Sequence, residues 1–235
     1  MGDATEAVRW LQSAASSTGP DDLATLVLRT ARAVGATEIA VYLADYDQSA
    51  LVPLPAPGLD REILPIETTL AGRAFASLEA QRAPDNPDRL WVPLLDGCEH
   101  LGVLELVGTP ERTEAVGSEL AACVALLVKT RRAYGDAMER LRGRRPMQVA
   151  AEIVWGLLPP LSFAAEDVMV TAVLEPCYKV GGDVFDYALN GDVLSLGLFD
   201  TCGHGIKAST LASLTVGAYR NARRRGLDLV DTAGE

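Results

Sequence analysis

The sequence predicts an α+β protein made of amphipathic helices and short strands, without an internal repeat. Two observations support this class. Several segments carry apolar residues at helical spacing, and others alternate or run apolar for a few residues between glycines and prolines, as strands do. A chain of 235 residues that is 49% hydrophobic can bury one or two cores.

The overall charge and the cysteines narrow the class of protein further. A net charge of −11 argues against sequence-independent binding to nucleic acid or to an anionic membrane. The longest apolar run, residues 120–128, is far shorter than the ~20 residues that span a bilayer, and residues 1–6 lack the features of a signal peptide. Four cysteines without paired spacing are typical of reduced thiols. We therefore expect a cytoplasmic protein.

The first elements are two helices and a strand. Residues 1–20 form a separate N-terminal segment with a short helix around residues 7–15. Asp21 and Asp22 can cap a helix that runs to about Val34, and Gly35 ends it. Residues 38–44 alternate as a strand does.

A loop, a helix and a hairpin follow. Residues 51–64 are rich in proline and glycine and predict a loop or an irregular edge. Residues 69–81 are predicted to be helical. Residues 89–95 and 101–107 are predicted strands, joined through residues 96–100, which contain an Asp-Gly turn.

This order of elements resembles the GAF domain, a small sensory module with a central antiparallel sheet flanked by helices. The resemblance covers residues 21–130 and rests on element order. It implies a sensor domain for a small ligand that the sequence does not identify.

A long helix leads out of this domain. It is predicted over residues 114–142, with Gly135 interrupting it and Gly143 closing it. We interpret residues 131–150 as a helical linker, and the basic run 140–145 as a solvated helix end or linker. The helix could pair with its copy in a homodimer, although a clean heptad repeat is absent.

The C-terminal part is predicted to alternate helices and strands. A helix over residues 148–158 ends at Pro159 and Pro160. Residues 168–174 and 193–199 are predicted strands. A helix over residues 205–225 ends at Gly226, with arginines in its last turn, where positive charge suits the helix dipole.

Two aspartates at predicted strand ends are the candidate site. Asp183 follows Gly181 and Gly182, which let the backbone bend and approach a ligand closely, and Asp200 follows the strand 193–199. Carboxylates from adjacent strands favour Mg²⁺ or Mn²⁺ over zinc. Each has a simpler interpretation: Asp200 could cap the next helix, and Asp183 could be a turn residue.

Three segments in order resemble the SpoIIE-type branch of the PPM (protein phosphatase 2C-like) serine/threonine phosphatases. They read AEIVWGLLPP at 151–160, VGGDVFD at 180–186 and DTCGHGIKAS at 200–209. Val154 stands where this family usually has glutamine. The resemblance implies that residues 151–235 form the N-terminal part of a PPM-type α-β-β-α sandwich. Such domains need roughly twice the residues that follow position 148, so we expect a truncated or degenerate domain.

The resemblance also implies an activity and its residues. Asp183 and Asp200 would be catalytic metal ligands, with the carbonyl of Thr201 as a further ligand, for two Mn²⁺ or Mg²⁺ ions in a complete domain. A hydroxide held between the ions would attack a phosphoserine or phosphothreonine. The supporting loop would comprise Gly181, Gly182, Gly203, His204 and Gly205. His204 could instead act as a general acid. The implied substrate is a phosphorylated anti-sigma-factor antagonist in a bacterial regulatory pathway.

Two other interpretations stay open. The chain could be a non-catalytic sensory or dimerisation module that carries a remnant of a phosphatase domain. The segment Gly181–Phe185 also resembles the Gly-Gly-Asp-Glu-Phe loop of diguanylate cyclases, but Val184 stands in place of its acidic fourth residue.

Overall fold

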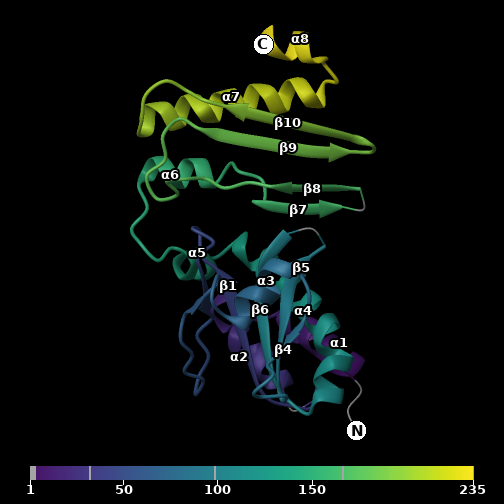
Figure 1. The fold of residues 1–235 in the computed structure, drawn as a ribbon. Coiled ribbons are helices and arrows are strands. Elements are labelled where there is room, and N and C mark those ends of the chain that lie inside the picture. The colour runs from purple at the N-terminus through teal and green to yellow at the C-terminus, as the bar shows by residue number, and fades with distance from the viewer. Residues whose placement is uncertain (1–3, 32, 98, 166, 235) are drawn as a thin grey trace. The chain divides into compact units, whose positions relative to one another are not determined.

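The computed structural model describes residues 4–31, 33–97, 99–165 and 167–234 (Figure 1). The chain divides into two compact units. The first comprises Met1–Arg144 with Ser162–Met169, and the second comprises Arg145–Leu161 with Val170–Glu235. Helices and antiparallel strands occur in both, which confirms the predicted α+β class.

A six-stranded antiparallel sheet organises the first unit. Its strands stand in the order β3-β2-β1-β6-β5-β4, and every neighbouring pair is antiparallel. Their bounds are Ala36–Ala44 (β1), Ala50–Pro53 (β2), Leu64–Pro65 (β3), Gln81–Arg82 (β4), Arg89–Asp96 (β5) and Glu99–Gly108 (β6). The predicted central antiparallel sheet with its 89–107 hairpin is confirmed.

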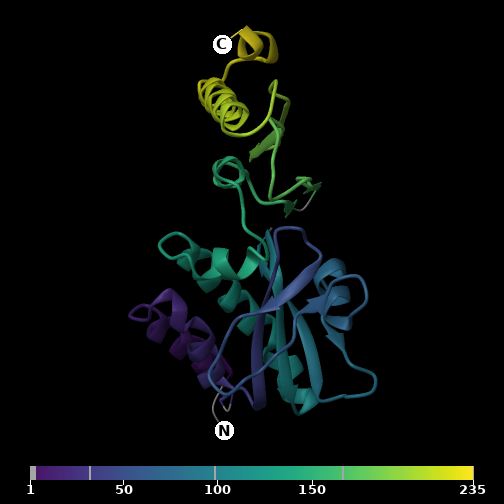
Figure 2. The ribbon, with the colours of Figure 1, turned by 90° about the vertical axis from the view of Figure 1, so that its left-hand side faces the viewer.

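Helices cover both faces of this sheet. In Figure 2 the purple helices α1 and α2 lie on one side of the sheet and the blue helix α3 on the other. The helices of the unit are α1 (Ala4–Ala15), α2 (Leu23–Thr30), α3 (Leu70–Ser77), α4 (Pro110–Arg132) and α5 (Ala137–Arg142). The predicted helical linker therefore starts inside this unit, because α4 packs on β5 and β6.

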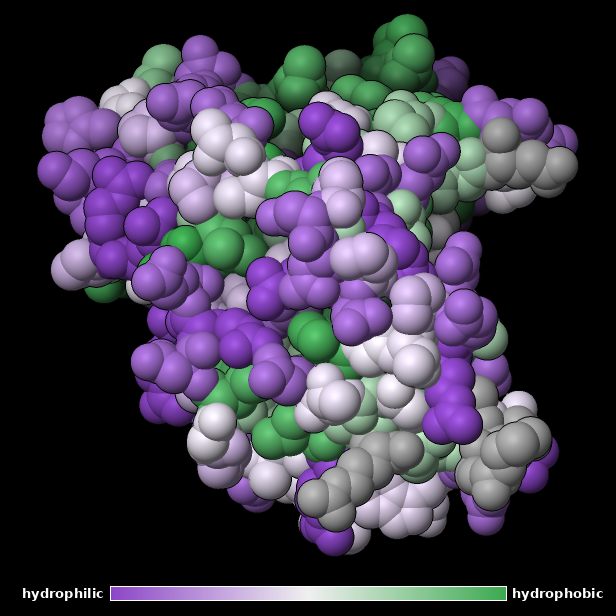
Figure 3. Space-filling view, turned by 60° about the horizontal axis from the view of Figure 1, so that its bottom comes forward, coloured by the Kyte–Doolittle hydropathy of each residue, from purple (hydrophilic) through white to green (hydrophobic). Residues whose placement is uncertain are grey.

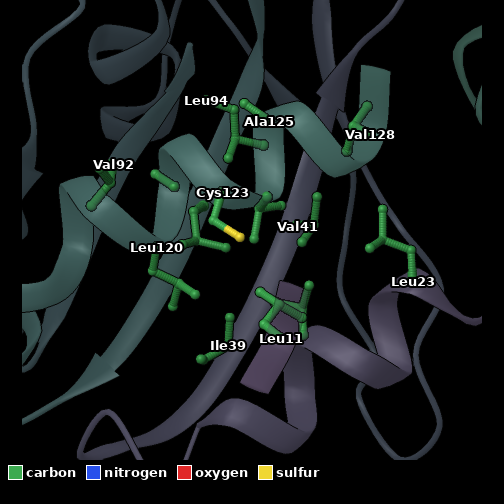
Figure 4. Close-up of a cluster of buried hydrophobic side chains, with 14 of the residues drawn as sticks. Leu11, Leu23, Ile39, Val41, Val92, Leu94, Leu120, Cys123, Ala125 and Val128 are labelled. Carbon is green, nitrogen blue, oxygen red and sulfur yellow. The ribbon is translucent and has the colours of Figure 1, made fainter. Parts of the chain in front are cut away.

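The main core lies between the sheet and helices α1, α2 and α4. Figure 4 shows side chains from these elements meeting there, among them Leu11, Ile39 and Leu120. Leu11 and Leu120 are completely buried, and full burial of a leucine contributes roughly 1.5–3 kcal/mol. Residues 1–20, which the sequence sets apart as a separate segment, supply α1 to this core, since Val8, Leu11 and Ala15 share one helical face.

Several predicted boundaries in the first unit were wrong. Helix α2 ends at Thr30 rather than at Val34, and the region predicted as a loop contains β2. Apolar side chains of β2 pack beside β1, so the nearby prolines do not prevent pairing. Helix α3 ends four residues early because Leu78 adopts a left-handed φ of 60°. The long helix is interrupted between Arg132 and Ala137, around Gly135 as predicted.

The basic run 140–145 is exposed at Arg140, Arg144 and Arg145, and two of its arginines also contact the first unit. The Arg142 guanidinium lies 4.7 Å from the centroid of the Tyr46 ring, and its Nε donates to the carbonyl oxygen of Ala44 at 2.9 Å. Arg144 pairs at 3.2 Å with Asp45, whose side chain is completely buried. A buried carboxylate needs a cation or hydrogen-bond donors. This need explains the contact that Arg144 makes, while the prediction of a solvated run is confirmed for the exposed arginines.

The second unit is smaller. It contains α6 (Val149–Trp155), β9 (Val184–Asn190), β10 (Val193–Phe199), α7 (Ile206–Arg224) and α8 (Leu229–Gly234). Strands β9 and β10 form a two-stranded sheet. Residues 162–169, which belong to the first unit, include β7 (Ser162–Ala165), and β7 pairs with β8 (Val168–Thr171) in a separate two-stranded sheet. Strands β7 and β9 and helix α8 were missed by the sequence analysis, and β8 ends before the predicted position 174. The predicted sandwich stays a prediction.

The core of the second unit holds α6, α7 and the β9–β10 hairpin together. Ala151 and Val154 of α6 and Ala212 and Val216 of α7 are fully or almost fully buried there. Small side chains on both helices let α6 and α7 approach closely. These contacts hold the hairpin against α7, which begins directly after the loop that follows β10.

The surface is mostly polar where it is seen in space-filling view. Figure 3 shows a face on which hydrophilic side chains predominate and hydrophobic ones are exposed in separate patches. Within the described ranges, the structure contains no helix with the length and apolar character needed to cross a bilayer.

Candidate functional site

The register of the β9–β10 hairpin places the two candidate aspartates opposite each other. Val184 pairs with Phe199 at the open end of the hairpin. The pairing continues beyond it, because the Thr201 amide donates to the Gly182 carbonyl at 3.2 Å. Asp183 and Asp200 lie between these pairs, on the same face of the sheet. Directly opposite residues have Cβ atoms about 4.5–5.5 Å apart, so the structure brings these two carboxylates together.

The two aspartates line a hollow of about 290 Å³. The other residues that line it are apolar: Val173, Leu174, Val184, Phe185, Leu198 and Phe199. Both aspartates are exposed. Neither carboxylate forms an ion pair with a lysine, arginine or histidine of the described ranges. Two adjacent carboxylates beside an apolar wall are thus open to a cation from solvent.

Gly182 is required at its position because the backbone of Thr201 lies against it. A Cβ atom added to Gly182 would meet the Thr201 carbonyl oxygen at 2.1 Å and Oγ1 at 2.2 Å. Thr201 is buried, and its Oγ1 lies 3.1 Å from the carbonyl oxygens of Gly182 and Ala208. Thr201 therefore ties the start of β9 to α7. Its carbonyl lies beside Gly182, outside the lining of the hollow, and its role as a metal ligand stays a prediction.

The glycines after β10 shape the connection to α7. Gly203 and Gly205 adopt φ of 98° and 71°, which favour glycine. Gly205 is the N-cap of α7, which has no side-chain cap. Asp200 is therefore not the cap of the following helix. His204 is exposed and does not line the hollow. A Cβ atom added to Gly181 would meet no atom within 4 Å, so no close contact requires glycine there.

The sequence analysis missed the ion-pair network that fixes this hairpin. Asp186 is 1% exposed. Its Oδ1 accepts from Arg220 Nε at 3.0 Å and Nη2 at 2.6 Å, and its Oδ2 accepts from Arg223 Nη1 at 2.7 Å. Arg220 also donates to the carbonyl of Leu157 at 2.5 Å. The signal in the sequence was an aspartate within the apolar segment 184–189, with two arginines three residues apart on the helix that follows.

The contacts with Asp186 also change the pKa of Arg223. Burial lowers the pKa of Arg223, but its hydrogen bond and charge interaction with Asp186 outweigh burial and raise it. The arginine thus stays charged when it packs against the sheet. The network joins β9, α7 and the end of α6 and so holds the open end of the hairpin in place.

A second polar cluster lies on the sheet of the first unit. The side chain of Glu105 is 2% exposed and lies 2.7 Å from Arg61 Nε and 3.1 Å from Arg89 Nε. Burial, and then the charge of Glu105, raise the pKa of the neighbouring Tyr42. Tyr42 meets Trp91 edge to face, with ring centroids 5.6 Å apart.

The donor set limits what the aspartate pair can bind. Its two carboxylates are hard oxygen donors and suit Mg²⁺ or Mn²⁺. Across the described residues, no group of three or more His, Cys, Asp or Glu side chains gathers as a metal site would require. Cys98 lies outside the described residues, and the described cysteines Cys123, Cys177 and Cys202 form no disulfide with one another.

Comparison with solved structures gives similarity to GAF domains over about half of the chain. Free methionine-R-sulfoxide reductase from Neisseria meningitidis, in complex with its substrate, is 19% identical over 56% of this chain and 92% of its own, with a TM-score of 0.45. A GAF domain structure is 12% identical over 52% and 85%, with a TM-score of 0.43. A GAF domain/HD domain protein from Geobacter sulfurreducens is 16% identical over 52% and 98%, with a TM-score of 0.39.

These similarities concern the fold alone. None of the three TM-scores reaches 0.5, and we draw nothing about activity from them. No protein-family model and no curated protein matches the chain.

Proposed function

We propose that the second unit is the front part of a metal-dependent protein serine/threonine phosphatase domain of the PPM, SpoIIE-type branch, and that the first unit is its GAF-type sensor. The observation that carries the proposal is the pair Asp183 and Asp200, which face each other across the open end of a hairpin. The required approach of Gly182 to Thr201 supports it. In this reading Gly182 is needed to bring the strands together rather than to contact a ligand.

The residues fit a divalent cation in type and position. Asp183 and Asp200 would hold it with their carboxylates, at the rim of the hollow. Such a cation lowers the pKa of a bound water and offsets charge on a phosphoryl group. The apolar wall beside the carboxylates would exclude water from one side and receive the side chain next to the phosphorylated residue. His204 is exposed outside the hollow and is assigned to loop shape rather than to proton transfer.

The site as described supports binding better than turnover. A two-ion phosphatase centre holds its ions with more ligands than two carboxylates. We therefore propose that the 235-residue chain binds one Mn²⁺ or Mg²⁺ weakly and hydrolyses phosphoserine peptides slowly or not at all. The phosphoprotein substrate of a complete domain, of the anti-sigma-factor antagonist type, is part of the same proposal.

Electron paramagnetic resonance of Mn²⁺ tests the binding step directly. Titration of the purified chain should give a population of bound Mn²⁺ that Asp200→Asn reduces at least tenfold in affinity, because one of two charged ligands is lost. Asp192→Asn, in the turn of the same hairpin, is the matched control and should bind normally. Equal binding by the parent chain and Asp200→Asn would contradict the metal assignment.

A second candidate follows from the small number of ligands. With only two carboxylates gathered, the chain would be a sensory or dimerisation module with a phosphatase remnant. A chain that binds no Mn²⁺ at millimolar concentration and hydrolyses no phosphate ester would favour this candidate. Robust Mn²⁺-dependent hydrolysis of a phosphoserine peptide by the chain alone would exclude it.

A further inference from the structure

The two aspartates of the candidate site lie one residue from the open end of the β9–β10 hairpin. Toward the turn, the paired strands β9 and β10 support them. Toward the open end, the Thr201 amide donates to the Gly182 carbonyl at 3.2 Å. An antiparallel ladder alternates hydrogen-bonded and non-hydrogen-bonded pairs, and side chains lie closer in the second kind. Because Gly182 and Thr201 are hydrogen bonded, Asp183 and Asp200 form a pair of the closer kind.

Two carboxylates at this spacing repel each other. Both are exposed, and neither forms an ion pair with a cationic side chain of the described ranges. Like charges directly opposite each other destabilise a sheet, and the ends of an element fray most readily. Repulsion between Asp183 and Asp200 therefore favours opening of the hairpin at the site. A restraint close to Asp200 is needed to keep the two carboxylates together before a cation binds.

The side chain of Thr201 supplies such a restraint. Thr201 is 8% exposed, whereas the next three residues, 202–204, are exposed. Its Oγ1 lies 3.1 Å from the carbonyl oxygen of Gly182, before β9, and 3.1 Å from that of Ala208, in the first turn of α7. A hydroxyl has one proton to donate, so the two carbonyls share it. One buried hydroxyl next to Asp200 thus connects both strands of the hairpin to α7.

We propose that Thr201 is the positioning residue of the aspartate pair: its hydroxyl holds Asp200 opposite Asp183 before a cation binds. A pair that is already in place binds a cation more tightly, because binding does not have to bring the two carboxylates together first. The hydroxyl carries this role, since valine has nearly the same shape as threonine but cannot donate a hydrogen bond. The effect on metal binding rests on the proposed function, whereas the positioning can be measured without a metal.

A disulfide between the two positions tests the positioning directly. In a Cys202→Ser background, the double variant Asp183→Cys/Asp200→Cys should form a disulfide between the introduced cysteines. The Cα atoms of such a pair are about 4.5 Å apart, which is within disulfide reach. Equilibration with glutathione then gives the effective concentration of one thiol at the other. Adding Thr201→Val should lower that concentration about fivefold, because one hydrogen bond is lost, and Thr201→Ser, which keeps the hydroxyl, should stay within about twofold.

Manganese binding tests the consequence for the site. With both aspartates in place, Thr201→Val should weaken Mn²⁺ binding about fivefold in the electron paramagnetic resonance titration, and Thr201→Ser should restore it. Val154→Ala is the matched control for both measurements. It shortens a completely buried side chain of α6 in the same unit, so it should lower the stability to urea. It should change neither the effective concentration of the thiols nor the Mn²⁺ affinity of the folded chain.

The outcomes distinguish this inference from the proposed function. Failure of the double variant to form the disulfide, or equal effective concentrations with Thr201→Val and Thr201→Ser, would overturn the inference. An equally large effect of Val154→Ala would overturn it too, since a general loss of stability would then explain the result. Unchanged Mn²⁺ affinity in Thr201→Val would contradict its consequence for the site. A chain that shows the expected thiol result but binds no Mn²⁺ would support the positioning and contradict the proposed function.

Discussion

Two adjacent glycines should respond in opposite ways to the same substitution. Gly182→Ala places a methyl group 2.1 Å from the Thr201 carbonyl oxygen, so the strands must separate. The hydrogen bonds from the Thr201 amide and Oγ1 to the Gly182 carbonyl, at 3.2 and 3.1 Å, would then be lost. Each contributes about 1 kcal/mol, and the residual overlap costs about 1–2 kcal/mol more. We expect the second unit to lose about 3–4 kcal/mol of stability.

Gly181→Ala is the matched control. A Cβ atom there meets nothing within 4 Å, and restricting the unfolded chain stabilises by about 0.4–1 kcal/mol where the backbone allows it. Urea unfolding followed by tryptophan fluorescence measures both, since Trp155 lies in the second unit. Hydrogen exchange of residues 182–201 localises the effect. Equal stabilities for the two variants would refute the reasoning that Thr201 requires a glycine at position 182.

Three further outcomes follow from the structure. Asp186→Asn should lower the stability of the second unit by about 2–4 kcal/mol, because Arg220 and Arg223 would then face a buried neutral side chain instead of a carboxylate. Arg224→Ala, on the exposed side of α7, is the control and should cost under about 0.5 kcal/mol in the same urea titration. Burial lowers the pKa of His100 from its ordinary value of 6.5, so its contribution to stability is full above that pH and is lost as the pH falls toward the folded pKa. His100→Gln should flatten the fall in urea stability between about pH 7 and 5, and an unchanged pH profile would contradict this. A fragment of Met1–Arg144 should fold alone with a cooperative transition, since the main core lies within it; a broad, non-cooperative melt would count against that unit.

The sequence was most informative where periodicity is strong. The strands near 38–44, 89–95 and 101–107 and helix α7 were predicted because apolar residues repeat there with a clear period over seven or more residues. Strand β9 was missed because Asp186 stands in its buried face. A charge at a core position reads as a loop unless its partners are known, and those partners, Arg220 and Arg223, lie on a different element.

The candidate site was predictable in type but not in full geometry. Two aspartates at strand ends were recognisable from the glycines beside them. What the sequence did not reveal is that Gly182 accommodates the backbone of Thr201, since that contact depends on the hairpin register. For the same reason the contact between Arg144 and Asp45 was not predicted, because Asp45 is 99 residues away in the chain and buried.

The Asp186 network also constrains the order in which the second unit folds. The arginines that neutralise Asp186 come 34 and 37 residues later in the chain. A hairpin of β9 and β10 that formed first would have to keep this carboxylate in water, and so could not bury its inner face. Burying the inner face of the hairpin and docking α7 therefore occur together. The entropy lost in closing the long loop between Asp186 and its arginines opposes both steps until the ion pairs form. We infer that the hairpin can bury its inner face only when α7 docks against it.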